Sequence, residues 1–167
     1  MESVRKVLKW LWTIEATVCV IAFAGTALAL MADVLAREFF GNGIFGAQRF
    51  AVWTNAVAGL LGFAIVTAER GHLRPSFADK LLPKAIEPHA DRLGELVSTV
   101  ICLGLAWMAV QFVRSSAALG ERGMAIPILV WPIQLVLPWM FFSSALRHAA
   151  YAAWPALRPL PRSEMPS

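Results

Sequence analysis

The sequence predicts an all-α integral membrane protein: four transmembrane helices plus a short amphipathic interfacial helix between the second and third. Three observations predict this class. Apolar residues make up 58% of the 167 residues and charged residues only 16%, whereas soluble domains carry roughly 25% charged residues. Uncharged residues gather in four long runs, and basic residues gather on alternate connections between them. A soluble enzyme and a nucleic-acid-binding domain are both disfavoured, and the lipid bilayer is the expected surroundings.

The four uncharged runs are long enough to cross a bilayer. They contain 17, 19, 18 and 24 residues, and a hydrocarbon core of about 30 Å needs about 20 helical residues. Allowing for interfacial residues at their ends, we predict transmembrane helices over 11–32, 49–68, 94–114 and 125–147. These spans and their connections leave no room for a second folded domain, so residues 1–167 are expected to form a single membrane domain.

The first predicted span carries one acidic residue, Glu15, about one turn inside its cytoplasmic end. A cleaved signal peptide is the alternative for this segment, but its apolar stretch exceeds the roughly 7–15 residues of an h-region. Ionisable groups within a membrane pair with a partner or mark an ion or proton pathway. We expect Glu15 to make an interfacial or subunit-pairing charge contact, and a coupling site is the alternative.

The second predicted span carries small and polar residues on one helical side. Asn55, Gly59 and Gly62 recur with Ala51 at helical spacing. Such a face lets helix backbones approach closely, which favours helix association in lipid. We predict that this face is a packing surface.

The connection between the second and third spans predicts the short interfacial helix. Ser76 follows Pro75 and precedes Asp79 by three residues, which resembles a capping box. Apolar and basic residues then separate onto two sides, as in a helix that lies in the membrane surface. The alternative is an ordinary solvated loop.

Prolines mark the fourth predicted span and the tail. Pro127, Pro132 and Pro138 predict a kinked or partly broken helix. Four further prolines follow Trp154, too many for a helix interior. We therefore predict a flexible tail over residues 155–167.

The distribution of Lys and Arg predicts the orientation. The N-terminal segment, the second connection and the C-terminal side carry 11 of the 15 basic residues, and the other two connections carry 4. Cytoplasmic connections of membrane proteins carry the excess of basic residues. Both termini are therefore predicted to be cytoplasmic.

The sequence shows no constellation for catalysis, a cofactor or a metal. His72, His89 and His148 fall outside the predicted spans, so haem ligation between membrane helices is not expected. Cys19 and Cys102 lack metal-ligand spacing and resemble small apolar residues. We expect no enzyme activity, because no nucleophile with a base and an orienting partner is evident.

Several short motifs resemble the small membrane subunit, of DctQ type, of tripartite ATP-independent periplasmic (TRAP) transporters. The motifs follow the first span, end the second and begin the fourth. Their residues are Asp33-Val34, Arg37 and Gly41; Leu61-Gly62 and Arg70-Gly71-His72-Leu73; and Ile128, Trp131, Pro132 and Pro138. The sequence departs from the family before the second helix, where a glutamate is common and Ala47, Gln48 and Arg49 stand instead.

The resemblance implies a non-catalytic subunit of a sodium-gradient-driven organic-acid importer in the bacterial inner membrane. Its partners would be a large membrane subunit, which it braces, and a periplasmic solute-binding protein, which it helps to dock. The candidate motif or subunit-packing residues are Arg37, Asn55, Gly59, Gly62, Arg70, Gly71, His72, Trp131, Pro132 and Pro138.

Other functions are open at this point. One is an autonomous four-helix homo-oligomeric transporter that uses Glu15 as its coupling group. Another is the membrane anchor of a redox complex. A third is the related tripartite tricarboxylate family, which also has a small four-helix subunit.

Overall fold

The computed structural model describes residues 2–69, 87–123 and 127–158. Helices account for most of them, and the described backbone contains no strand beyond one isolated bridge. The elements are α1 (Glu2–Phe40), α2 (Ala47–Ala68), α4 (Glu87–Leu119), α5 (Trp131–Gln134), α6 (Val136–Ala153) and the 3-10 turn η1 (Pro155–Leu157). The all-helical class predicted from the sequence is confirmed.

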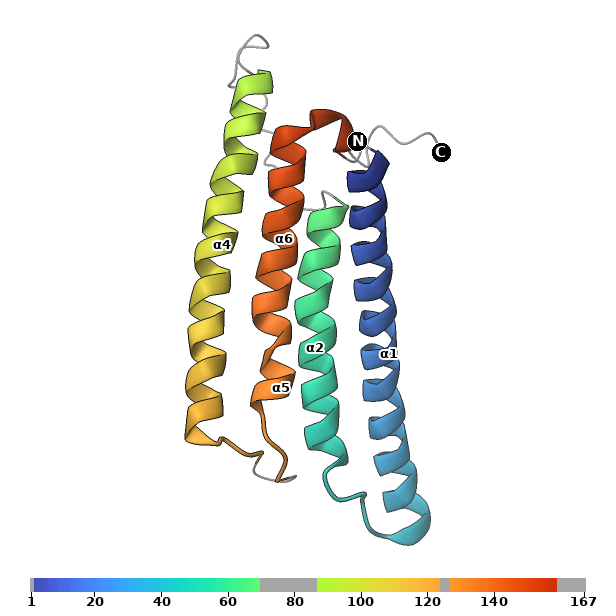
Figure 1. Cartoon of the computed structure of the whole chain (residues 1–167). Coiled ribbons are helices and arrows are strands. Elements are labelled where there is room, and N and C mark those ends of the chain that lie inside the picture. Colours follow the sequence, from blue (N-terminus) through green and yellow to red (C-terminus); the bar gives the residue numbers. More distant parts are fainter. Residues whose placement is uncertain (1, 70–86, 124–126, 159–167) are drawn as a thin grey trace, which may run out of the picture.

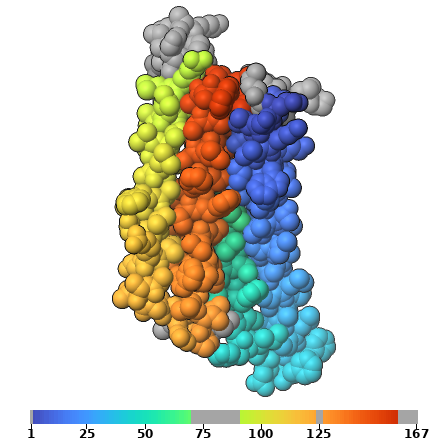
Figure 2. Space-filling model, in the orientation of Figure 1, coloured from blue at the N-terminus to red at the C-terminus, as the bar shows by residue number. Residues whose placement is uncertain are grey.

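The long helices lie side by side in a row, in the order α4, α6, α2, α1 (Figure 1). The main contacts join neighbours in this row, and α1 touches α6 at few points. Because a single layer has no opposite layer to cover it, large apolar side chains of the outer helices remain exposed. Examples are Ile21 and Leu28 of α1 and Val100 and Trp107 of α4. Figure 2 shows one broad face of the layer.

Within the described residues, three helices are long and apolar enough to cross a membrane: α1, α2 and the Asp91–Leu119 part of α4. They contain the predicted spans 11–32, 49–68 and 94–114, and all but α2 extend well beyond them at both ends. The 18 residues of α6 do not reach the same apolarity, because Arg147 and His148 interrupt them. A fourth transmembrane helix is therefore not confirmed.

The fourth helix differs from its predicted range of 125–147. Helix α5 begins at Trp131, the regular helix is interrupted at Leu135, and α6 continues to Ala153. Pro138 has no N–H to donate to the carbonyl of Gln134, and its ring clashes with that carbonyl in a regular helix. This accounts for the break, which agrees with the predicted interruption of the helix by proline.

Two surface segments were predicted beside the spans. The interfacial helix falls within residues 70–86, which lie outside the described residues. Of the tail predicted to be flexible from residue 155, residues 159–167 lie outside the described residues, and residues 155–158 form a turn. There η1 forms, and the Arg158 side chain donates to the Tyr151 carbonyl and the Asp91 carboxylate, both at 3.2 Å.

The register of α1 against α2 follows from hydrogen bonds between the two helices. Cys19 Sγ donates to the Ala58 carbonyl at 3.4 Å, and Thr26 Oγ1 lies 3.5 Å from the Ala51 carbonyl. In an antiparallel pair, this register puts Ala68 level with Lys9 and Ala47 level with Leu30. The 22 residues of α2 span about 33 Å, close to the bilayer core of about 30 Å. The last ten residues of α1 therefore extend beyond the start of α2.

Candidate functional site

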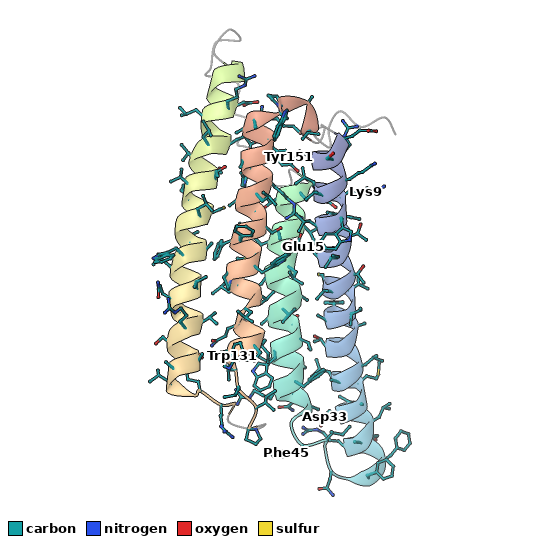
Figure 3. All side chains as sticks on the ribbon, in the orientation of Figure 1. Lys9, Glu15, Asp33, Phe45, Trp131 and Tyr151 are labelled. Carbon is teal, nitrogen blue, oxygen red and sulfur yellow. The ribbon has the colours of Figure 1, made fainter. Side chains whose placement is uncertain are left out.

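A buried ion pair joins α1 to α6 near the upper end of the row, where Figure 3 labels Glu15. Arg147 Nη2 lies 2.5 Å from Glu15 Oε2, and both side chains are only 1% exposed. Ser143 Oγ donates to Glu15 Oε1 at 2.5 Å and accepts from Arg147 Nη1 at 2.6 Å. Both carboxylate oxygens are therefore occupied by donors of the same chain.

Helix periodicity brings these side chains together. Ser143 and Arg147 are four residues apart, so they share one face of α6. Glu15 lies on the buried face of α1 with Leu11 and Ala22. The sequence predicted a charge partner for Glu15 at an interface or between subunits, and the structure places that partner within the chain.

Sequence reasoning missed Arg147 and Ser143 as members of this cluster. Arg147 was used only in the charge count that set the orientation. A signal was nevertheless present, because Glu15 precedes the first uncharged run and Arg147 follows the fourth. Both charges were thus expected at the same membrane surface, although their contact depends on which helices are neighbours.

Polar contacts next to the ion pair connect α6 to α2. Ser144 Oγ donates to Thr67 Oγ1 at 3.5 Å, and the Tyr151 hydroxyl donates to the Ala68 carbonyl at 3.3 Å. The Ala68 carbonyl is one of the last four carbonyls of α2, and these have no N–H donor within the regular helix. Together these contacts attach the end of α2 to the face of α6 that carries Arg147.

A second polar cluster connects α6 to α4. His148 Nδ1 lies 2.7 Å from Glu95 Oε2, and Arg158 Nη1 lies 3.2 Å from Asp91 Oδ2. Both pairs are mostly buried, and they connect helices at the end of the row that also holds the Glu15–Arg147 pair. Among the described residues, no three or more His, Cys, Asp or Glu side chains are grouped so as to hold a metal ion.

At the opposite end, Asp33 organises the connection between α1 and α2. Its side chain accepts from Arg37 Nη2 and from the Ile44 backbone N–H, both at 2.8 Å. Asp33 lies beyond the predicted span 11–32, and the residue is 3% exposed. The Arg37 guanidinium lowers the pKa of the Asp33 carboxyl, burial opposes this shift, and the Ile44 N–H adds to it.

No helix in the described part of the chain covers most of the predicted packing face of α2. Asn55 and Gly59 are exposed and Gly62 is partly exposed, and a Cβ added to either glycine would meet no atom within 4 Å. The side of α2 that is buried carries Ala51, Ala58, Leu61 and Ala64 instead. Of the predicted face, Ala51 contacts a helix of this chain and the rest faces outward.

The other predicted residues lie in separate places. Arg37 is at the lower end beside Asp33. Trp131 and Pro132 form the start of α5, and Pro138 is buried in the first turn of α6. The motif of Arg70, Gly71 and His72 lies outside the described residues. Those of the predicted residues that the structure describes are therefore not brought together into one site.

An apolar groove of about 540 Å³ runs along the contact between α4 and α6. Its walls include Trp107 of α4 and Trp139 and Phe142 of α6, all of which are exposed. The residues that line it are apolar throughout, so the groove offers a hydrophobic surface and no chemical group for catalysis.

One family of known proteins has a model that matches most of this chain. The model of a family described as tripartite ATP-independent periplasmic transporters, DctQ component, matches residues 26–158. The match covers most of the chain, including Arg147 and Asp33, and begins after Glu15. No curated protein matches the chain.

Proposed function

This chain belongs to the DctQ family of tripartite ATP-independent periplasmic transporter components, and from this premise we propose that it is the non-catalytic small subunit of a sodium-gradient-driven organic-acid importer. Membership and the apolar helices make it a multi-pass membrane component of a tripartite transporter. In our proposal it braces the large membrane subunit and contributes to docking of the periplasmic binding protein.

The single-layer arrangement of the helices is the observation that carries the bracing role. Among the described residues, the row leaves broad apolar faces and covers only the seams between neighbouring helices. On α2, the exposed Asn55 amide and the open backbone at Gly59 favour a protein neighbour over lipid, since small residues permit close helix approach and amides hydrogen-bond across helices. A larger helical subunit packed on this face would supply a hydrogen-bond partner for the Asn55 amide and a helix to pack closely at Gly59.

The ion pair argues against an autonomous transporter that uses Glu15 as its coupling group. A coupling carboxylate faces a cavity or pathway, whereas both Glu15 oxygens are held by Ser143 and Arg147. The pair instead fixes α1 against α6, two helices that otherwise make few contacts.

We also propose that α6 is the fourth transmembrane helix and that both termini are cytoplasmic. Helix α6 lies between α2 and α4, two helices able to cross a membrane, and Glu15 compensates the charge of Arg147 that lowers its apolarity. Reporter fusions test the orientation: Gly43 and Gly120 are expected to report the periplasm and Pro83 the cytoplasm. A periplasmic signal at Pro83 contradicts the proposal.

Co-expression with the large membrane subunit and the binding protein tests the function. We expect a tagged form of this chain to retain the large subunit through purification in mild detergent. Uptake of an organic acid into proteoliposomes should then require all three components and a sodium gradient. The proposal fails if the chain purifies as a homo-oligomer that transports alone, above all if Glu15→Gln abolishes that transport.

A further inference from the structure

We propose that the end of α1, through Phe39 and Phe40, is the part of this subunit that contacts the water-soluble periplasmic component of the transporter. This inference rests on the proposed function and names the surface used. The two side chains are 75% and 81% exposed, although the transfer of a phenylalanine side chain out of water is favourable. Exposed apolar clusters with polar surroundings mark interaction surfaces, and the exposed Glu38 and Arg37 adjoin this one.

The position of the two rings along α1 argues against lipid as their neighbour. Leu30 is level with the first residue of α2, so Phe39 and Phe40 lie nine and ten residues further along a continuous helix. This corresponds to about 14–15 Å along the helix axis from the start of α2, and to about 10–12 Å from residue 32, where the predicted span 11–32 ends. A tilt of about 20° changes either distance little. The headgroup zone is only about 5–8 Å thick, so the rings stand beyond it.

The same position favours the soluble component over the large membrane subunit. The end of α1 and its loop form the most distant part of the described molecule at this end, beyond the connection between α4 and α5 (Figure 1). A membrane subunit that packs on the row meets the faces of the helices. A soluble protein that approaches from the periplasm meets this projection first.

The loop that follows the two rings is held in one shape without any partner. Gly41 takes a φ of 73° and ends α1, with its N–H donating to the Arg37 carbonyl at 3.0 Å. Asp33 then accepts from the Ile44 N–H. A Cβ on Gly43 would lie 2.6 Å from Asp33 Oδ1, and Asp33 is buried and already bound by two donors. A surface fixed in this way loses little conformational entropy on binding.

Site-specific photo-crosslinking tests the contact in the assembled transporter. Benzoylphenylalanine replaces Phe40 in one sample and Val20 in the matched control, because Val20 is a similarly exposed residue in the middle of the same helix. After reconstitution with the large subunit and the binding protein, we expect Phe40 to crosslink the binding protein and Val20 not to do so. Crosslinks from Phe40 to lipid or to the large subunit alone overturn the inference.

A transport assay provides an independent measurement. Double replacement of Phe39 and Phe40 by Ser should raise the binding-protein concentration for half-maximal uptake by about tenfold, the effect of losing a hot-spot contact. Replacement of both by Leu, which keeps apolar side chains at these positions, should leave the concentration for half-maximal uptake close to that of the unmodified subunit. An unchanged concentration dependence in the Ser variant overturns the inference. If the unmodified chain does not retain the large subunit during purification, that result contradicts the proposed function rather than this inference.

Discussion

The two ends of the helix row are held by different kinds of contact. At the upper end, Glu15 contacts Ser143 and Arg147, which are 128 and 132 positions away along the chain. At the lower end, Asp33 contacts Arg37 and Ile44, only 4 and 11 positions away. A buried carboxylate thus fixes the arrangement of helices at one end and the shape of a single loop at the other.

This difference implies that loss of the upper contact affects the whole subunit, whereas loss of the lower contact acts locally. In a single layer each helix has few neighbours, so one contact between α1 and α6 carries more of the arrangement than it would in a compact bundle.

Arg147→Ala should cause the largest loss of stability. It leaves the Glu15 carboxylate buried without its cation, which costs about 3–5 kcal/mol. We expect a marked fall in the thermal unfolding temperature of the purified subunit in detergent. The double variant Glu15→Leu/Arg147→Met, which removes both charges, should recover a large part of the loss. If the double variant is as unstable as the single one, the ion pair is not the source of the effect.

Gly43→Ala should have a smaller and local effect. The added methyl group would press on the Asp33 carboxylate, and we expect a cost of about 1–2 kcal/mol, within the usual range for point variants. Limited proteolysis of the connection between α1 and α2 measures it. Gly104→Ala is the matched control, because no atom lies within 4 Å of its added methyl group. Equal protease sensitivity of both variants contradicts the role of Asp33.

Gly62→Leu should leave the isolated subunit stable and reduce its assembly. A Cβ at this position would meet no described atom within 4 Å, so we expect the isolated subunit to accommodate the larger side chain, whereas a helix packed on this face would be displaced. The measurements are the unfolding temperature of the subunit alone and the yield of large subunit that purifies with it. An unstable isolated subunit, or an unchanged yield, contradicts this prediction.

A change of pH near neutrality should have the smallest effect, because we expect the contacts of the Asp33 carboxylate to be unchanged there. Because the folded state lowers the pKa of this carboxyl, its stabilising contacts are complete above the unfolded pKa of about 3.9. They are lost as the pH falls through the lower, folded value. We therefore expect protection of the Ile44 amide against hydrogen exchange to be retained between about pH 5 and 8, after correction for intrinsic rates. Reduced protection at pH 5 contradicts the assignment.

Local patterns were sufficient for several features of the fold. The uncharged runs located the long helices, because a helix in lipid must be apolar over the thickness of the core. Pro138 indicated the break before α6, because a missing N–H acts on its own helix. Glu15 was identified as a residue that needs a partner, because an isolated charge is costly away from water.

Other features were not accessible from local patterns. The folded turn at 155–158 was missed because its stability depends on Arg158 reaching Asp91 of α4. The sequence predicts a packing face on α2, but it does not show that this face is open within the described residues while the neighbouring side with Ala58 and Leu61 is buried. Both sides are apolar or small, so the composition of the helix does not separate them.

The amino-acid sequence thus determines the class of this protein, the approximate positions of its long helices and the charge pattern of their connections, since all of these depend on residues near one another in the chain. The order of helices in the row, the pairing of Glu15 with Arg147 and the outward face at Asn55 and Gly59 emerge from tertiary packing. The physical reason is that lipid and neighbouring helices are similarly apolar, so helix partners are selected by shape and by a few polar contacts between distant residues.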